Sequence, residues 1–175
     1  MFVDVCFPNN NEKEFILIAK KLKTDALIFV YDKPSKVISK DTIKTFSAMQ
    51  ESGGYLNKFK ILGKKCVFYY DYRTSKNFHA PLKTVNQVLI KDIKRHNNVV
   101  ALPFYQILKY KQIEEQKFIM KLCQKYDVKL CIASFAHYPK ELRSKYDLLS
   151  IARSLGMNTK NVKKSISSLY KFITT

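Results

Sequence analysis

The residues best suited to chemistry lie in one stretch near the C-terminal end of the chain, residues 134–157. Arg143, Lys145 and Arg153 are residue types that bind phosphate oxygens. His137, in the same stretch, could contact a phosphate or a base, bind a metal ion, or serve as a hydrogen-bonded loop residue. The cations could also form no more than a solvated basic surface. The stretch therefore predicts a phosphate-binding segment, with a simple basic surface as the alternative.

Local signals predict a strand, a loop and a helix that position these side chains. The apolar run Val128 to Ala133 has the length and composition of a buried strand. Ser144 and Asp147 have the spacing of a capping box, just before apolar residues that repeat at helical spacing. Gly156 stands where a helix commonly ends in a left-handed residue. We therefore expect a strand that leads into a basic loop and a capped helix.

The rest of the chain alternates between strand-like and helical patterns, which is typical of an α/β protein with a mainly parallel sheet. Buried strands are predicted at residues 1–6, 26–31, 66–70 and 99–104. Helices are predicted at residues 12–22, 41–50, 84–95 and 112–126, with a last one starting at Asn158 or Thr159. Within the helix at 84–95, Val85 and Val88 are expected to face inward. Residues 71–81 are polar and irregular in pattern.

Size and charge limit the classes of function. The 175 residues, 46% of them hydrophobic, fit a single domain spanning residues 1–175. The net charge of +18 indicates a polyanionic partner. Eight basic and two acidic residues lie in residues 140–175 alone. No apolar run is long enough to span a membrane and no signal peptide is visible, so we expect a cytoplasmic protein.

Few features indicate catalysis by this chain. The four cysteines are widely spaced without a Cys-x-x-Cys pair, so they are expected to be reduced core residues rather than zinc ligands. No Gly-x-Ser-x-Gly motif or phosphate-binding Gly-x-x-x-x-Gly-Lys loop is present.

Tyrosines interleaved with lysines could stack on unpaired bases, or could equally lie at the edge of the core; the best placed are Tyr105, Tyr110, Tyr138 and Tyr146.

The motifs around the basic loop resemble a known family. Ser134, Ala136 and Pro139 form a Ser-x-Ala-x-x-Pro loop, which continues as Leu-Arg-Ser-x-x-Asp-Leu (residues 142–148) and Leu-Gly-Met (residues 155–157). This pattern resembles protein component 3 of archaeal ribonuclease P. That family is the counterpart of the thirty-kilodalton subunit of the eukaryotic enzyme and is related to the PHP phosphoesterase barrels. The resemblance covers roughly residues 86–165. It implies a reduced TIM-like (PHP-like) barrel of mainly parallel strands with surrounding helices.

The same resemblance implies a function and partners. The complex would be an endoribonuclease that removes the 5′ leader of precursor tRNA, with the catalytic magnesium ions on its RNA. This chain would carry no cofactor or metal of its own and would bind and organise that RNA, contacting precursor tRNA only indirectly. The component 2 protein would be its partner in a heterotetramer. The alternatives are a divergent PHP-type metal-dependent phosphoesterase and a general RNA-binding or ribosome-associated module.

The residues expected to contact RNA are named from the charge pattern and the resemblance together: Arg73, Arg95, His137, Arg143, Lys145 and Arg153. PHP enzymes carry a His-x-His ligand pair at the end of the first strand, where this sequence has Asp4-Val5-Cys6. His137 stands where such enzymes have a late ligand, and Phe135 takes the place of the Asp that usually precedes it. We therefore expect His137 to be a remnant of a metal site.

Overall fold

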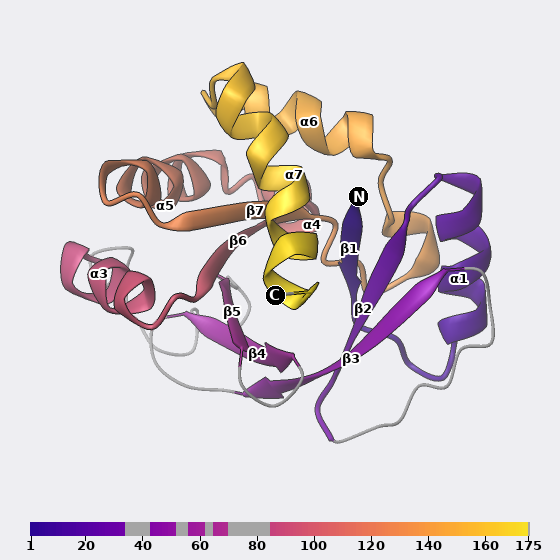
Figure 1. The fold of residues 1–175 in the computed structure, drawn as a ribbon. Helices are drawn as coiled ribbons and strands as arrows, with labels where there is room; N and C mark the ends of the chain where they lie inside the picture. Colours follow the sequence, from indigo (N-terminus) through magenta and orange to yellow (C-terminus); the bar gives the residue numbers. More distant parts are fainter. Residues whose placement is uncertain (34–42, 52–55, 62–64, 70–84, 175) are drawn as a thin grey trace.

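In a computed structural model, which describes residues 1–33, 43–51, 56–61, 65–69 and 85–174, seven strands form one sheet in sequence order. The strands are β1 (Val3–Cys6), β2 (Ala26–Tyr31), β3 (Lys44–Glu51), β4 (Asn57–Ile61), β5 (Lys65–Tyr69), β6 (Val99–Pro103) and β7 (Lys129–Ala133). Only β4 runs against its neighbours, and the pairs β1–β2, β2–β3, β5–β6 and β6–β7 are parallel. The sheet curves round until its first and last strands meet (Figure 1).

The meeting of β1 and β7 makes the sheet a nearly closed barrel. A parallel bridge pairs Cys6 with Ala136, just beyond the end of β7. The Ala136 N–H donates to the Val5 carbonyl at 3.1 Å, and the Phe7 N–H donates to the Ala136 carbonyl at 2.8 Å. Because this bridge satisfies backbone groups that would otherwise form an open edge, the loop after β7 is part of the barrel wall.

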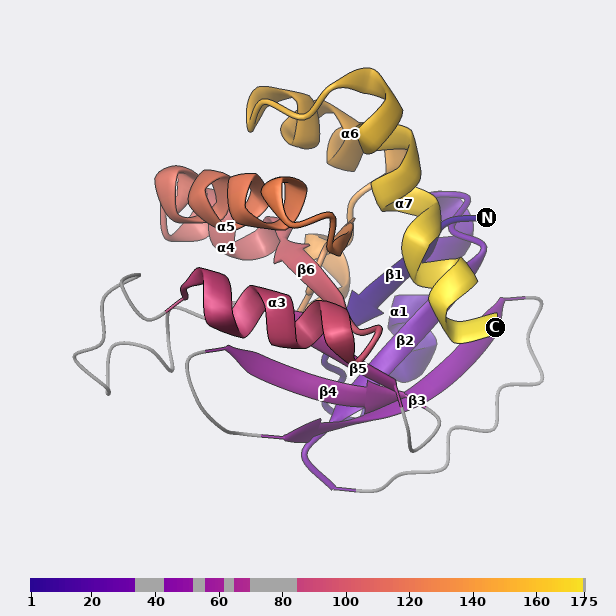
Figure 2. The ribbon, with the colours of Figure 1, turned by 60° about the vertical axis from the view of Figure 1, so that its left-hand side comes forward.

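Helices cover the outside of the barrel, and one lies across its opening. The helices are α1 (Glu12–Lys21), α3 (Gln87–Arg95), α4 (Phe104–Lys109), α5 (Ile113–Lys125), α6 (Lys145–Ser154) and α7 (Thr159–Thr174), with a short 3-10 helix η3 (Pro139–Glu141). In Figure 1, α1 lies on the side of the barrel opposite to α3 and α5, and α7 crosses the opening between them. Figure 2 shows α6 above α5, and α7 running down from α6 past β1.

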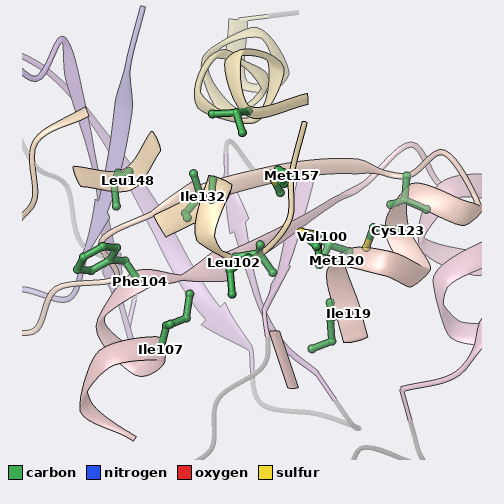
Figure 3. Packing of buried hydrophobic residues seen from close by; sticks show 14 of the residues in the cluster. Val100, Leu102, Phe104, Ile107, Ile119, Met120, Cys123, Ile132, Leu148 and Met157 are labelled. Atoms are coloured by element: carbon green, nitrogen blue, oxygen red, sulfur yellow. The ribbon is translucent and has the colours of Figure 1, made fainter. Parts of the chain in front are cut away.

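The core has an inner layer and outer layers because strand side chains alternate between the two faces of the sheet. The inner layer includes Val5, Ile28, Val67 and Ala101, and α7 adds side chains such as Leu169. An outer layer packs the other faces of β6 and β7 against helices; it includes Val100, Leu102, Ile119, Ile132 and Leu148 (Figure 3). A smaller cluster packs α1 against β1 and β2.

Most of the predicted elements are confirmed within the described residues, and one is wrong. Residues 41–50 were predicted to be helical, whereas Lys44–Glu51 is strand β3. In this strand Phe46 and Ala48 pack with the barrel interior, while Thr45 and Ser47 alternate with them. This two-residue period belongs to a strand with one buried face.

A second difference concerns the helix predicted at residues 84–95, which begins at Gln87 after an Asn86 cap. The Asn86 side chain accepts hydrogen bonds from the Val88 and Leu89 N–H groups at 3.0 and 3.2 Å. Val85 is buried as expected, but Val88 is 69% exposed, so its predicted inward position is wrong. The predicted irregular segment at residues 71–81 lies outside the described residues.

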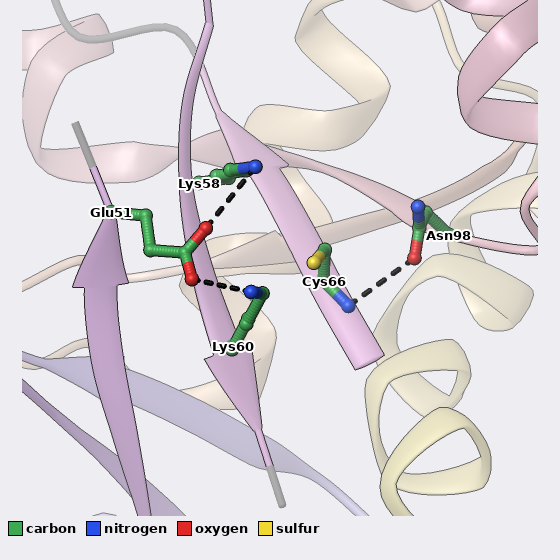
Figure 4. A network of polar contacts seen from close by, with 5 residues as sticks. All are labelled: Glu51, Lys58, Lys60, Cys66 and Asn98. Atoms are coloured by element: carbon green, nitrogen blue, oxygen red, sulfur yellow. Dashed lines mark hydrogen bonds and ion pairs between the residues drawn. The ribbon is translucent and has the colours of Figure 1, made fainter. Parts of the chain in front are cut away.

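Strand β4 exposes a polar face to the outside of the barrel. Lys58 and Lys60 Nζ lie 3.1 and 2.6 Å from the two carboxylate oxygens of Glu51 on β3 (Figure 4). Hydrogen bonds from Lys60 and Lys58 lower the pKa of Glu51. The inward residues of the same strand, Phe59 and Ile61, are fully buried. The outer charges therefore belong to an amphipathic strand and are paired within the sheet.

Candidate nucleic-acid interface

The loop after β7 is anchored by a buried carboxylate. Asp4 Oδ1 accepts hydrogen bonds from the Ser134 N–H at 2.6 Å and the Val5 N–H at 2.9 Å, and Asp4 Oδ2 accepts from the Ser134 hydroxyl at 2.6 Å. Ser134 Oγ in turn accepts from the Arg143 N–H at 2.9 Å. Burial raises the pKa of Asp4 to about 6, although the hydrogen bonds from Ser134 and Val5 oppose that rise. The Asp4 carboxylate therefore fixes both ends of the 134–143 loop.

Phe135 points into the barrel and closes its interior with an aromatic cluster. Its backbone φ is 54°, a left-handed conformation that is unusual for a bulky residue. Its ring lies 4.9 Å from that of Tyr69 and about 6 Å from those of Phe7 and Phe59. Burying a phenylalanine side chain contributes about 2–3 kcal/mol, which offsets a backbone cost of about 1–2 kcal/mol. The end of the barrel where β1, β5 and β7 finish is thus filled by rings.

His137 lies at the rim of this aromatic cluster. Its ring stacks on Phe7 with 4.6 Å between centroids and a 9° interplanar angle, and Tyr105 meets it edge-on at 5.8 Å. The His137 N–H donates to Glu141 Oε2 at 2.9 Å, and that oxygen also accepts from the Tyr138 N–H at 3.1 Å. The half-buried imidazole is therefore held between the rings of Phe7 and Tyr105.

Arg143 is partly a structural residue of the loop. Its Nη1 donates to the carbonyls of Lys140 and Leu142 at 3.0 and 3.1 Å, and its guanidinium carbon lies 5.8 Å from the centroid of the Phe104 ring. These contacts occupy one of its three nitrogens. The other two nitrogens of a guanidinium can still donate to a phosphate. Arg143 can therefore hold the loop and bind an anion at the same time.

Helix α6 presents two further predicted cations to solvent. The predicted capping box is confirmed, since the Asp147 N–H donates to Ser144 Oγ at 3.2 Å and the Ser144 N–H donates to Asp147 Oδ2 at 3.1 Å. Lys145 is at the first position of α6 and Arg153 in its last turn, and both are exposed. At 1.5 Å per residue they are about 12 Å apart along the helix axis.

The end of α6 also follows its prediction. Gly156 has φ 99°, and its N–H donates to the Arg153 carbonyl at 2.8 Å, while the Met157 N–H donates to the Ala152 carbonyl at 3.1 Å. These two bonds define a Schellman motif. The buried Met157 side chain then fixes the turn into α7.

The other two predicted RNA contacts are not brought into this group. Arg95 is exposed in the last turn of α3, 3.8 Å from Asp92 Oδ1, shortly before β6 begins. Arg95 thus lies at the amino end of β6, whereas the 134–143 loop follows the carboxyl end of β7. Because β6 and β7 are parallel, these are opposite ends of the barrel. Arg73 lies outside the described residues. The described part of the loop surface thus combines His137, Arg143 and Lys145, with Arg153 further along α6.

Two residues that were not predicted from the sequence, Phe7 and Lys109, also lie at this surface. Phe7 follows β1 and stacks on His137. Lys109, at the end of α4, places its Nζ 4.8 Å from the Tyr105 ring centroid and 5.7 Å from that of Tyr110, and it donates to the Tyr105 hydroxyl. Tyr105 and Tyr110 were singled out as stacking candidates because lysines surround them, and the same observation could have included Lys109.

The residues at the first ligand position of PHP enzymes have other contacts here. Asp4 binds Ser134, and Cys6 Sγ points to the Ile28 carbonyl at 3.8 Å within the cluster that packs against α1. Across the described residues, no three His, Cys, Asp or Glu side chains are grouped as metal ligands would be. The four cysteines are buried and unpaired, as predicted. No helix in the described ranges is long and apolar enough to cross a membrane.

Comparison with known proteins finds similar solved structures but no similar sequence. No protein-family model matches the sequence, and no curated protein sequence matches it. The fold is similar to that of a chain in the cryo-EM structure of archaeal ribonuclease P with mature tRNA, with a TM-score of 0.64 and 15% sequence identity. The alignment covers 98% of this chain and 90% of that chain. At this identity the similarity concerns the fold, a nearly closed and mostly parallel α/β barrel.

Proposed function

We propose that this chain is a protein subunit of a ribonuclease P, of the component 3 type. The observation that carries the proposal is the similarity in fold, over almost the whole of both chains, to a chain from an archaeal ribonuclease P. The motifs of residues 134–157 support it independently, because the resemblance of the sequence leads to the same complex. The subunit would bind and organise the catalytic RNA during removal of the 5′ leader from precursor tRNA.

The surface around the 134–143 loop supports RNA binding. The exposed Tyr138 and Tyr146 offer faces on which unpaired bases can stack. Arg143 and Lys145 lie beside them in sequence and supply cations for the phosphates. The buried Asp4–Ser134 contact fixes the loop before the RNA arrives, which lowers the conformational entropy lost on binding.

In the proposed complex, the RNA catalyses the cleavage and this chain does not. At the carboxyl ends of β1, β5 and β7 the described interior holds Phe7, Tyr69 and Phe135. Phenylalanine rings carry no oxygen, and a neutral tyrosine hydroxyl is not among the carboxylate, carbonyl and water ligands that magnesium prefers. The magnesium ions would be bound by the RNA, and this chain would act as a scaffold within the endoribonuclease. The component 2 protein would be its partner in a heterotetramer, with precursor tRNA contacted indirectly.

Reconstitution tests this proposal directly. The purified chain, mixed with the ribonuclease P RNA and component 2 protein of its source organism, should lower the magnesium concentration needed to cleave precursor tRNA. An unchanged magnesium requirement would contradict the scaffold role. Metal-dependent release of phosphate or nucleotides by the chain alone would favour a phosphoesterase, and equal binding to every RNA without an effect on cleavage would favour a general RNA-binding module.

Replacing single cations tests the proposed surface. Lys145→Ala should weaken binding to ribonuclease P RNA and reduce the slope of log K against log salt by about 0.7–0.9, because one phosphate contact is lost. Arg143→Ala should do the same and also lower thermal stability, since Arg143 Nη1 binds two loop carbonyls. Lys13→Ala, an equal loss of charge in the first turn of α1, is the control. If all three variants have the same slope, the loop is not the RNA surface.

A further inference from the structure

A cavity of about 610 Å³ lies at the end of the barrel opposite to the 134–143 loop. It is bounded by α7 and by the turns that lead from α3 into β6 and from α5 into β7. Four lysines and a single aspartate carry the charges of its lining: Lys94, Lys129, Lys164, Lys171 and Asp127. The lining is therefore strongly cationic, and none of these residues belongs to the surface proposed above.

Two carboxamides of the cavity, those of Asn97 and Asn98, are oriented as hydrogen-bond donors. Asn98 Oδ1 accepts from the Cys66 N–H at 3.2 Å, and its Nδ2 is on the other side of the amide (Figure 4). Asn97 Oδ1 accepts from Lys129 Nζ at 2.6 Å. Because both oxygens already bind protein donors, each asparagine has its Nδ2 hydrogens left, and no described residue accepts a bond from either. The cavity thus offers asparagine and lysine donors together.

The only carboxylate among the described lining residues of the cavity, that of Asp127, faces solvent. The Asp127 side chain is 97% exposed and lies 3.5 Å from Lys94 Nζ, so it neutralises one lysine at the rim. Three serine hydroxyls in the lining donate to backbone carbonyls, of which that of Ser168 donates to the Leu130 carbonyl at 2.9 Å. The ammonium group of Lys164 and the Asn97, Asn98 and Lys129 donors line the cavity together with Gln124, Asn161 and Lys171. A group with several acceptor oxygens and negative charge would match them.

We propose that this cavity binds a phosphate of an RNA backbone, so that the chain contacts RNA at both ends of its barrel. Lys and Asn donors are among the side chains that proteins use for phosphates of nucleic acids. Lys129 begins β7 and Ser134 follows its end, so the two surfaces are roughly 16 Å apart along the strand. That spacing separates them by several nucleotides. The choice of RNA as the polyanion rests on the proposed function; the anion site itself does not.

The experiment compares two pairs of substitutions with equal loss of charge. Lys129→Gln with Lys164→Gln removes two cations of the cavity, and Lys13→Gln with Lys21→Gln removes two exposed cations from α1, on the other side of the barrel (Figure 1). Binding of each to a short poly(U) RNA is measured by fluorescence anisotropy over a range of salt. The cavity pair should reduce the salt slope by about 1.4, the value for two phosphate contacts on a single strand. The α1 pair should change it by less than half of that.

Two further measurements keep the result unambiguous. Lys129→Arg with Lys164→Arg should keep the slope of the unmodified protein, which separates lost charge from lost folding. In nuclear magnetic resonance spectra, the side-chain amide signals of Asn97 and Asn98 should shift on addition of poly(U). Equal slopes for the two glutamine pairs would overturn the proposal, as would amide signals that shift with inorganic phosphate and not with RNA.

Failure of this inference can be told from failure of the proposed function. If the chain lowers the magnesium requirement of ribonuclease P while the cavity pair behaves like the α1 pair, only the second site is wrong. If the chain has no effect on cleavage while the cavity pair still loses salt dependence with poly(U), the ribonuclease P role is wrong and the phosphate site stands.

Discussion

Asp4 is a charged residue in a place without solvent. It is 0% exposed, and its two oxygens accept three hydrogen bonds, from Val5 and from the backbone and hydroxyl of Ser134. Removing a carboxylate from water is costly, and hydrogen bonds from neutral groups offset that cost only in part. This explains why the pKa of Asp4 rises to about 6 although all three neighbours favour the charged form.

A raised pKa makes folding stability depend on pH. The folded Asp4 has a pKa of about 6 against 3.8 for the unperturbed group, so between these values the native state binds more protons than the unfolded state. Asp4 should therefore stabilise the fold fully below pH 4 and lose roughly 3 kcal/mol of that contribution as the pH rises through 6. Asp4→Asn cannot titrate and should remove this part of the pH dependence, measured as urea unfolding free energies from pH 4 to pH 7.

The control for this prediction is Asp127→Asn, an identical change at a side chain that is 97% exposed. It should leave the difference between pH 4 and pH 7 as it is in the unmodified protein. If Asp4→Asn has the same pH profile as Asp127→Asn, the Asp4 carboxyl titrates at its ordinary pKa and its burial has no energetic consequence.

Single residues show why the site was only partly predictable. The charges of the 134–157 segment were apparent because they are contiguous in sequence. The contacts that shape the loop join Ser134 to Asp4, and Phe7 to His137, across about 130 residues. No local sequence pattern identifies such a pair. A serine after a strand, such as Ser134, can form several kinds of hydrogen bond, so its type alone does not predict its partner. The sequence therefore predicted which residues are cationic but not what fixes them.

Helix α6 is the element whose prediction was most complete, and its start can be tested. Ser144→Ala removes the oxygen that accepts from the Asp147 N–H, and it should destabilise the protein by about 1 kcal/mol, within the usual range for a lost cap. Ser150→Ala, at an exposed position inside the same helix, should be neutral or slightly stabilising, because alanine has the higher helix propensity. Thermal unfolding of both variants measures the difference. Equal melting temperatures would mean that the cap adds nothing to the fold.

The elements also show where local patterns are ambiguous. Residues 99–103 and 129–133 are mostly apolar and lie in strands covered on both faces, so their composition alone identified them. Strand β3 has only Phe46 and Ala48 as apolar residues on its inward face, and within a short window its polar residues fit a helix as well as a strand. Pairing with β2 and β4 decides its conformation, and that information lies outside the segment.

At the scale of the whole molecule, the barrel interior depends on a helix from the C-terminal end of the sequence. Leu169 of α7 is 1% exposed and packs with residues of the inner layer. Leu169→Ala should cost about 2–5 kcal/mol, because it leaves a cavity where α7 covers the barrel. Leu17→Ala on α1, where the leucine is 58% exposed, is the matched control and should cost well under 1 kcal/mol. Similar unfolding free energies for both variants would show that α7 does not seal the interior.

The bridge between Cys6 and Ala136 has a consequence for how the chain matures during its synthesis. β1 leaves the ribosome about 130 residues before Ala136, the partner for its outer edge. At typical rates of translation that delay is on the order of ten seconds. For this time the edge of β1 can pair with any other extended chain, and contacts of such high sequence separation form slowly even in a complete chain. The nascent protein should therefore depend on chaperones, or on early capture by a partner, until the loop after β7 emerges.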